Sequence, residues 1–539
     1  MKPSFGLGTL LLDLLLGTAL ASQKVMSGGR RDPLDADFEK LAVKTLKQWH
    51  VPGLAIAVVD GDDTWAAGYG NASIGSTPVT PSTLFYSGST TKAFTAAVLS
   101  LLVDSDAHPG VTWRTPISQL IRDDFVLQPE YAWAQEHLTI EDALTHRTGF
   151  PRHDKSLPAR SGPDAHVTAV RDITRSLRDL PMVLEPRTRW KYCNLMFMVL
   201  SHAIQELTRR WLGDVMREWI WEPLGMRSTY FSLDAALEAP EDLARGYYWE
   251  YKDQEGGYKE VPWLKLQEAS GAGAVVSNVL DYAKWIRCLV NEAAPLSKEG
   301  HKAIRTPRMV PSAEGKGLGG PSSYALGWHT NTYKGHRMYT HSGGMEAYGA
   351  DVFFFPDLKY GIVAMGNTAI TSNFAGRLLT WKLINDRLGI PESERYDWSS
   401  QFEKALNSSL EQFDKAIDKL YPGRANPALP RGLELKEYTG TYSHPAYHDL
   451  TIDLGDDPGR LRAVRVDFVW PMTFDFVHVS GEYWVIHIDM KNSPNALNGQ
   501  SARAEFKIGP NGKCDQVLIE FLEDGSEGVI PFTRATKTT

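Results

Sequence analysis

The sequence predicts an α/β (α+β) fold in which an antiparallel sheet carries a helical subdomain, followed by a small C-terminal antiparallel β-barrel. Strand-like runs stand near both ends of the segment 53–367, and helical segments occupy much of the interval between them. From about residue 431 the chain changes to short strand-like runs that are separated by Gly-Asp, Pro-Asn-Gly and Asp-Gly turns, which is typical of a meandering barrel.

Length and composition limit the class of protein. The chain has 539 residues, too many for one ordinary domain, and its 42% hydrophobic and 23% charged content are typical of a globular protein with a large core. The formal net charge is −8 and no Lys/Arg-rich patch occurs, so we expect no nucleic-acid partner. No long apolar run follows the N-terminal region, so we expect no internal membrane span.

The N-terminus has the pattern of a secretory signal peptide over residues 1–21. Lys2 supplies a positive start, residues 7–20 are mostly apolar, and Ala19-Leu20-Ala21 fits the small-x-small rule for cleavage. Asp13 interrupts the apolar stretch, so a membrane anchor and an unusual first helix are alternatives. We expect a secreted protein, or one in the secretory pathway.

Sequons and cysteines fit a secreted protein that is held together by packing. Asn71-Ala72-Ser73 and Asn407-Ser408-Ser409 are candidate N-glycosylation sites, at Asn71 and Asn407. The three cysteines, Cys193, Cys288 and Cys514, allow one disulfide at most, so no disulfide framework supports the fold.

The first domain is expected over residues 32–385. Residues 32–50 have the apolar spacing of an amphipathic helix, and strand-like runs at 53–60 and 64–70 flank a turn, which predicts a β-hairpin. A buried helix is expected to begin near Ser89, because residues 93–103 are apolar nearly all round.

The second half of this domain returns to strands. Residues 271–277 are rich in glycine and are expected to form a strand, with a helix opening at Asp281. Strands and turns alternate over 324–367, and a helix over about 374–385 closes the domain.

Residues 386–430 are expected to be a helical connector. Apolar side chains recur every three or four residues from 398 to 420, which predicts one amphipathic helix, and Tyr421-Pro422-Gly423 ends it. Residues 431–539 contain seven or eight strand-like runs, the first at 437–442, and form the predicted barrel domain.

The stretch Ser89-Thr90-Thr91-Lys92 carries the first chemical signal. Residues three apart on a helix lie on one face, so Ser89 and Lys92 are expected to be neighbours. A lysine that is desolvated in a buried helix is shifted towards its neutral form and is able to act as a base for the serine hydroxyl. The alternative is a helix-capping serine and a surface lysine.

Two further stretches supply candidate partners. Tyr192 and Asn194 lie in the stretch 189–194. A lysine ammonium near a tyrosine favours phenolate, so Tyr192 is a candidate for accepting the serine proton and delivering it to the leaving group. Asn194 is a candidate for orienting the lysine and for binding a substrate amide or carbonyl. The alternative is a buried tyrosine before a helix capped by Asn194.

His341-Ser342-Gly343-Gly344 ends a predicted strand, where glycines allow close backbone approach to a ligand. The backbone N–H groups of Gly344 and Ser89 are candidates for an oxyanion hole. A structural histidine is the alternative for His341. For His146, we expect a histidine held by hydrogen bonds at a helix end.

Taken in order, these stretches resemble the penicillin-recognising serine enzymes: class C β-lactamases, serine D,D-peptidases, D-aminopeptidases and their esterase relatives. The three signatures of that family are matched by Ser89-Thr90-Thr91-Lys92, Tyr192-Cys193-Asn194 and His341-Ser342-Gly343. The resemblance covers about residues 35–385 and implies a β-lactamase/transpeptidase-like catalytic domain.

The resemblance also implies roles for the site residues. It implies that Ser89 is acylated, that Lys92 and Tyr192 share general base and acid duty, and that Asn194 positions Lys92 and the substrate. The remaining roles concern the carbonyl: the N–H groups of Ser89 and Gly344 form the oxyanion hole beside Gly343, and His341 lines the acyl-donor site.

The implied function is a serine hydrolase that forms an acyl-enzyme with a small-molecule or peptide acyl donor: an ester, an amide or a D-amino-acid peptide. No metal or organic cofactor is required. An acyltransferase of small-molecule metabolism is one alternative, and a non-catalytic binding or sensor protein is another.

One departure from the family pattern bears on the substrate. The family usually carries lysine at the position of His341, and a mostly neutral histidine weakens recognition of a carboxylate, which disfavours β-lactams.

Residues 431–539 resemble the lipocalin-like domain of some of these peptidases, which borders the active site or an oligomer interface; lipid binding and simple stabilisation are alternatives. A homo-oligomer is compatible with this resemblance.

Overall fold

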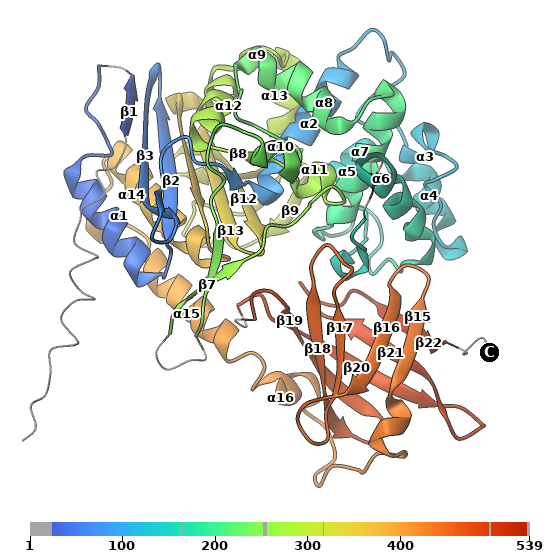
Figure 1. The fold of residues 1–539 in the computed structure, drawn as a ribbon. Helices are drawn as coiled ribbons and strands as arrows, with labels where there is room; N and C mark the ends of the chain where they lie inside the picture. The colour runs from blue at the N-terminus through green and yellow to red at the C-terminus, as the bar shows by residue number, and fades with distance from the viewer. Residues whose placement is uncertain are drawn as a thin grey trace, which may run out of the picture.

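The computed structural model describes residues 24–27, 29–160, 162, 165–251, 256–315, 317–494 and 497–535. It contains a domain built on a large antiparallel sheet, a helical connector and a closed barrel (Figure 1). The expected signal peptide, residues 1–21, lies outside the described residues. None of the helices among the described residues combines the length and apolarity that a membrane span requires.

The predicted antiparallel sheet is confirmed. Its strands lie in the order β1-β3-β2-β14-β13-β12-β11-β10-β9, and β4 pairs with β3. The predicted hairpin is β2 with β3, in register from Gly53 opposite Gly70 to Asp60 opposite Asp63. The bounds are β1 Lys24–Ser27, β2 Gly53–Asp60, β3 Asp63–Ser73, β4 Thr77–Pro78, β9 Met309–Ser312, β10 Ser322–Tyr324, β11 His329–Tyr333, β12 His336–Met345, β13 Tyr348–Phe355 and β14 Tyr360–Gly366.

Helices cover both faces of this sheet. Along the fully buried β2, Leu54, Ile56 and Val58 face the core that contains α1 (Ala36–Gln48) and α14 (Thr371–Arg387). The alternate β2 side chains face the core that contains α2 (Thr91–Val103) and α12 (Val279–Asn291). Because both faces are buried, β2 is apolar throughout rather than alternating.

The helical subdomain lies beside the sheet on the α2 side (Figure 1). Two short strand pairs lie outside the large sheet, β5 (Phe85–Tyr86) with β8 (Val276–Ser277) and β6 (Gly246–Trp249) with β7 (Tyr258–Val261). The remaining helices are α3 Ile117–Leu120, α4 Ala132–His137, α5 Ile140–Leu144, α6 Ala165–Ser176, α7 Asn194–Thr208, α8 Leu212–Met216, α9 Glu222–Leu224, α10 Leu233–Leu237, α11 Ser270–Gly273 and α13 Lys298–Arg305.

The strand expected over 271–277 is wrong for most of its length. Residues Ser270–Gly273 form the short helix α11, and only Val276–Ser277 are a strand. The glycines serve close packing: a Cβ on Gly271 would lie 2.5 Å from Oγ1 of Thr95 and 2.6 Å from Oγ of Ser201. Small residues are needed there because α11 passes between α2 and α7.

The connector consists of two helices rather than the expected one, α15 (Trp398–Leu410) and α16 (Ala416–Leu420). Phe402 of α15 stacks on Phe374 of the first domain, with ring centroids 4.7 Å apart. Ala416 of α16 packs against Val479 and Val485 of the barrel. The helix is broken because its two halves pack on different domains.

The predicted C-terminal barrel is confirmed as a closed barrel of eight antiparallel strands. Its interior is packed with rings: those of Tyr438, Tyr442, Trp484 and Phe506 contact one another at 5.0–6.1 Å. The strands are β15 Gly440–His444, β16 His448–Leu454, β17 Leu461–Arg465, β18 Met472–Ser480, β19 Tyr483–Met490, β20 Gln500–Ile508, β21 Cys514–Phe521 and β22 Val529–Arg534.

Candidate active site

Ser89 and Lys92 lie side by side, as their spacing predicts. Ser89 is half-buried in a 3₁₀ turn over Gly88–Thr90 that leads into α2, and Lys92 is fully buried. Nζ of Lys92 lies 3.0 Å from Oγ of Ser89, 2.8 Å from Oδ1 of Asn194 and 2.8 Å from the carbonyl oxygen of Ala272.

This arrangement suits a neutral lysine. Burial, and next the positive charge of Arg152, hold the pKa of Lys92 well below its usual value. A neutral amine has two N–H bonds, and two acceptors, Asn194 and the Ala272 carbonyl, face it. Its lone pair is then available to the hydroxyl proton of Ser89.

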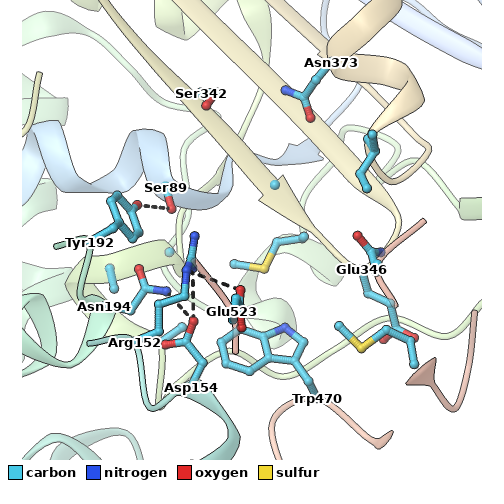
Figure 2. Close-up of a pocket in the computed structure, with 18 of the residues that line it drawn as sticks. Ser89, Arg152, Asp154, Tyr192, Asn194, Ser342, Glu346, Asn373, Trp470 and Glu523 are labelled. Atoms are coloured by element: carbon cyan, nitrogen blue, oxygen red, sulfur yellow. Dashed lines mark hydrogen bonds and ion pairs between the residues drawn. The ribbon is translucent and has the colours of Figure 1, made fainter. Parts of the chain in front are cut away.

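The hydroxyl of Tyr192 approaches Ser89 from the other side. Its oxygen lies 2.9 Å from Oγ of Ser89 (Figure 2). Its ring contacts the ring of His146 and the guanidinium of Arg152. Burial raises the pKa of Tyr192, while Arg152 and the hydrogen bond with Ser89 act in the opposite direction. Burial is the largest of these effects, and it favours the neutral phenol over the phenolate considered from the sequence.

Asn194 links Lys92 to a carboxylate. Its Oδ1 accepts a hydrogen bond from Lys92, and its Nδ2 donates one to Oδ2 of Asp154 at 2.9 Å. Asn194 is the first residue of α7, and its N-cap position is occupied by Cys193. The alternative reading of Asn194 as a helix cap is therefore wrong.

His341 is buried, and each of its two ring nitrogens has a hydrogen-bond partner. Its Nδ1 lies 2.7 Å from the carbonyl oxygen of Ser342 and its Nε2 lies 2.9 Å from the hydroxyl of Tyr324. Because Nδ1 must donate to the carbonyl, Nε2 accepts from Tyr324. Burial, and next His329, hold the pKa of His341 well below its usual value, so the ring offers a substrate no cation.

Gly343 and Gly344 place β12 against the turn that carries Ser89. A Cβ on Gly343 would lie 1.9 Å from the carbonyl oxygen of Ser87, and a Cβ on Gly88 would lie 2.8 Å from the backbone nitrogen of Gly344. Glycines allow this approach, which brings the backbone of Gly344 against the turn that carries Ser89.

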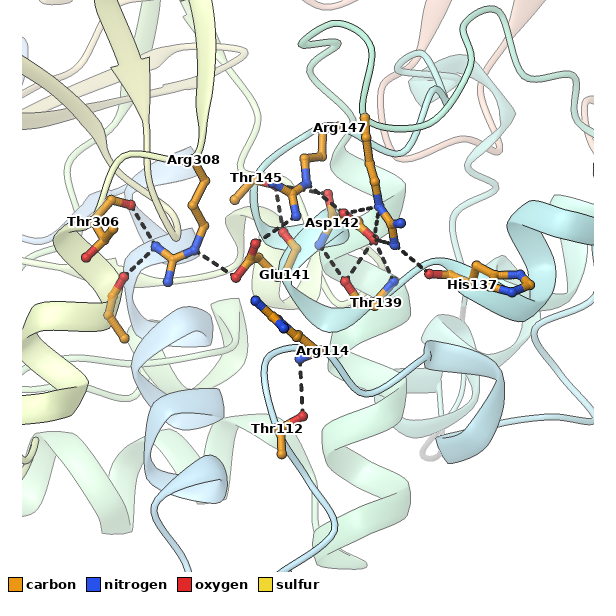
Figure 3. Close-up of polar contacts among 12 residues, drawn as sticks. Thr112, Arg114, His137, Thr139, Glu141, Asp142, Thr145, Arg147, Thr306 and Arg308 are labelled. Atoms are coloured by element: carbon orange, nitrogen blue, oxygen red, sulfur yellow. Dashed lines mark hydrogen bonds and ion pairs between the residues drawn. The ribbon is translucent and has the colours of Figure 1, made fainter.

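An ionic cluster around the buried carboxylate of Asp142 links the loop after α5 to the segment that leads to Tyr192 (Figure 3). Asp142 lies 2.6 Å from Arg147 and 2.7 Å from Arg187, and hydrogen bonds from both arginines hold its pKa low against the opposing effect of burial. The backbones of the same two segments are hydrogen-bonded where the nitrogen of Lys191 donates to the carbonyl of His146. His146 is thus held in place, and its Nδ1 accepts from the backbone of Cys193.

Sequence reasoning missed three charged residues of the site: Arg152, Asp154 and Glu523 (Figure 2). Arg152 lies 3.2 Å from Asp154 and 3.3 Å from Glu523, which belongs to the loop between β21 and β22 of the barrel. Nothing in the sequence pairs Arg152 with a residue so far along the chain.

A cavity of about 360 Å³ opens beside Ser89, a size typical of small-molecule sites. Arg152 is the one cationic side chain among the described residues that line it, and it is paired with carboxylates. Both domains form the wall, and the barrel contributes Trp470, Met472, Met490, Asn498, Gln500 and Glu523. Nowhere in the described ranges do three or more His, Cys, Asp or Glu side chains gather in a way that would hold a metal ion.

This fold and this site define a serine hydrolase that works through an acyl-enzyme. The chain belongs to the Beta-lactamase family, whose family model matches residues 38–383. Residues 424–532, which include most of the barrel, match a domain of unknown function (DUF3471).

Two curated relatives are similar over nearly the whole chain. The "Unguisins hydrolase ungD'" of Aspergillus campestris is 44% identical over 490 residues, 90% of each chain. The "Unguisins hydrolase ungD" of Aspergillus violaceofuscus is 40% identical over 89% of this chain and 87% of its own.

Solved structures share the fold. An octameric penicillin-binding protein homologue from Pyrococcus abyssi is similar over 92% of this chain and 99% of its own, with a TM-score of 0.56 and 20% identity. A D-amino acid amidase from Ochrobactrum anthropi covers 67% of this chain and 99% of its own, with a TM-score of 0.53 and 21% identity.

Proposed function

We propose that the acyl donor of this hydrolase is an amide, ester or D-amino-acid peptide. We also propose that its substrates include unguisins, the compounds that appear in the names of two relatives. The observation that carries the catalytic part is the position of Ser89, whose Oγ lies between Nζ of Lys92 and the hydroxyl of Tyr192 at 3.0 and 2.9 Å. Identity of 40–44% over about nine-tenths of the chain supports the substrate.

In the proposed mechanism, Oγ of Ser89 attacks the substrate carbonyl and its proton passes to Lys92. The backbone N–H groups of Ser89 and Gly344 stabilise the negative charge that develops on the carbonyl oxygen. Tyr192 relays the proton from Lys92 to the leaving amine or alkoxide, which departs as the acyl-enzyme forms. A water molecule then attacks the ester carbon, gives its proton to the same pair and restores the Ser89 hydroxyl.

The charges of the cavity support a substrate that is not anchored by a carboxylate. Arg152 is paired, and His341 is held neutral between Tyr324 and Ser342. These contacts agree with the weaker carboxylate recognition that the histidine predicts from the sequence. They favour a neutral acyl donor over a β-lactam.

One experiment tests both parts. Purified protein is incubated with an unguisin, and product mass is read for the addition of one water while intact protein mass is read for an acyl adduct. We expect product with wild type and none with Ser89→Ala. Ser342→Ala, which removes another hydroxyl that lines the cavity, serves as the matched control and should retain product. Product with Ser89→Ala would refute the nucleophile, and an adduct with other peptides or esters but not with an unguisin would refute the substrate.

We also propose that the chain is secreted after removal of residues 1–21 and is glycosylated. The N-terminal pattern supports secretion, and Asn407 is exposed on α15 whereas Asn71 is half-buried in β3. Expression in a fungal host followed by N-terminal sequencing and peptide mass mapping tests this. A start at Met1, or unmodified Asn71 and Asn407, would refute the corresponding part. The homo-oligomer stays a prediction for light scattering.

A further inference from the structure

A loop of the barrel reaches the proton-transfer residues through Arg152. The loop lies between β21 and β22, and it places Glu523 3.3 Å and Asp524 2.8 Å from Nε of Arg152. Nη1 of the same guanidinium lies 3.2 Å from Asp154, and its central carbon lies 4.7 Å from the ring centroid of Tyr192. Arg152 is thus fixed by carboxylates from both domains directly beside the site.

The loop itself is anchored to the first domain by two lysines. Lys155, whose side chain is 1% exposed, lies 3.0 Å from Glu523 and 3.5 Å from Glu527. Lys191, next to Tyr192 in the chain, donates to the carbonyl of Asp524 at 2.6 Å. The ion pairs of Lys155 are largely shielded from water and specific in geometry, so they hold the loop beside Arg152.

We propose that Arg152 is a positioning residue for proton transfer at Ser89, and that Glu523 and Asp524 of the barrel hold it in place for this role. The barrel is then part of the catalytic apparatus and not only a wall of the cavity. This inference rests on the proposed roles of Ser89, Lys92 and Tyr192.

The physical effect follows from the sign of the charge. A cation near Lys92 disfavours the ammonium, and the same cation over Tyr192 makes the phenol proton easier to transfer. Arg152 acts in both of these directions. Asp154 opposes it at Lys92 and, through Asn194, fixes the orientation of the same amine.

Other groups facing this pair also enter the balance. The titratable groups that act on or are affected by Lys92 are Arg152, Asp154, Tyr192, Cys193, His146 and His341. Those around Arg152 are Asp154, Lys191, Tyr192, Glu523, Asp524, Glu527 and His146. Both histidines are held neutral by burial, so Arg152 and the carboxylates dominate.

The first test is the pH dependence of kcat/KM for a p-nitrophenyl ester. Since the base has to be neutral, activity rises with pH through the pKa of Lys92. Arg152→Met should move this acidic limb upward by about one pH unit, which is roughly a tenfold loss of kcat/KM on the limb. Arg152→Lys keeps a cation and should leave the limb close to wild type. Arg503→Met, which breaks an ion pair with Glu520 on the barrel, is the control and should leave it unmoved.

The second test concerns the barrel. Removing the negative charges of Glu523 and Asp524 would by itself lower the pKa of Lys92 and move the limb downward. If Arg152 is no longer held beside Lys92, its positive charge acts less on the amine, which raises the pKa of Lys92 and moves the limb upward. On the proposal, the lost hold on Arg152 outweighs the two lost charges, so Glu523→Gln/Asp524→Asn should shift the limb upward. With Arg152→Met already present there is no guanidinium to hold, so the same two substitutions should have no upward effect. The double-mutant cycle isolates this coupling.

Three results would overturn the inference. One is an unshifted limb in an Arg152→Met protein that unfolds with the cooperativity of wild type. Another is a rise in KM alone, which would make Arg152 a substrate contact. The last is a downward shift in the barrel variant. Failure of the proposed function is distinct, because wild type would then show no Ser89-dependent labelling by a fluorophosphonate at any pH.

Discussion

The hydroxyl oxygen of Tyr192 lies 2.9 Å from Oγ of Ser89, although 103 positions separate the two residues. In the proposed mechanism this phenol protonates the leaving group. The loss of kcat in Tyr192→Phe should therefore depend on the leaving group, because a departing amine needs a proton whereas p-nitrophenolate does not. We expect a loss of about 10²–10⁴ in kcat for an amide and a much smaller loss for a p-nitrophenyl ester.

Lys92→Ala provides the comparison, because the base that activates Ser89 is needed for both substrates. We expect the variant to lose activity on both by similar factors, measured as initial rates at saturating substrate. Equal losses on ester and amide in Tyr192→Phe would contradict the assignment of Tyr192 to the leaving group.

The two adjacent glycines of β12 should respond differently to alanine. A Cβ on Gly343 would lie 1.9 Å from the Ser87 carbonyl oxygen, whereas a Cβ on Gly344 meets no atom within 4 Å. Gly343→Ala must push β12 away from the Ser89 turn and misplace the second oxyanion donor, at a cost of about 10²–10³ in kcat. Gly344→Ala should lose far less. The opposite ranking in p-nitrophenyl ester kinetics would exclude this geometry for the oxyanion hole.

A substitution of Trp470 tests whether the barrel residues that line the cavity contact the substrate. It is half-buried and lines the cavity from the loop between β17 and β18 (Figure 2). Trp470→Ala should raise KM for a bulky peptide substrate roughly tenfold or more through lost apolar contact, and leave p-nitrophenyl acetate nearly unchanged. Trp133→Ala, at a 53% exposed position on α4, is the matched control. A KM unchanged for every substrate would remove Trp470 from the binding surface.

His153 should make stability depend on pH. Its ring joins the Tyr447 hydroxyl of the barrel to the carbonyl of Pro181, and burial lowers its pKa from 6.5 to about 4. On acidification, His153 therefore becomes protonated at a higher pH in the unfolded chain than in the folded protein. The stability from neutral His153 is present above pH 6.5 and is lost as pH falls to 4, by about 3 kcal/mol for a fully buried group.

The measurement is urea unfolding of wild type and His153→Asn across this pH range. Asparagine tolerates the positive φ of 50° at this position. The variant should be less stable at pH 7.5, and the difference should narrow as the pH falls. A constant difference would show that His153 is not held neutral in the folded protein.

The sequence was sufficient for the parts of the site that have fixed local spacing. Ser89 and Lys92 are one turn apart, Tyr192 and Asn194 flank one residue, and glycines follow His341, so each group is recognisable without knowledge of the fold. The hairpin and the antiparallel sheet followed in the same way from strand patterns and turn residues.

The remainder depends on contacts that no local pattern encodes. Arg152 and Asp524 are 372 positions apart, and a single arginine after a proline has no distinctive spacing. Small residues at 270–273 fit a strand and a tightly packed helix equally well. The last barrel strand, β22, contains Pro531, and a proline usually argues against a strand, so its local pattern is weak.

Glu523 and Asp524 lie far along the chain, so they are synthesised long after the residues of the first domain. A ribosome makes Asp524 372 residues after Arg152, so a nascent chain acquires Ser89, Lys92 and Tyr192 long before it acquires the carboxylates that hold the guanidinium. On the proposal above, a truncated or unfinished polypeptide has a nucleophile without its tuned proton carriers. The guanidinium can therefore be held by carboxylates of both domains only once the barrel has been made.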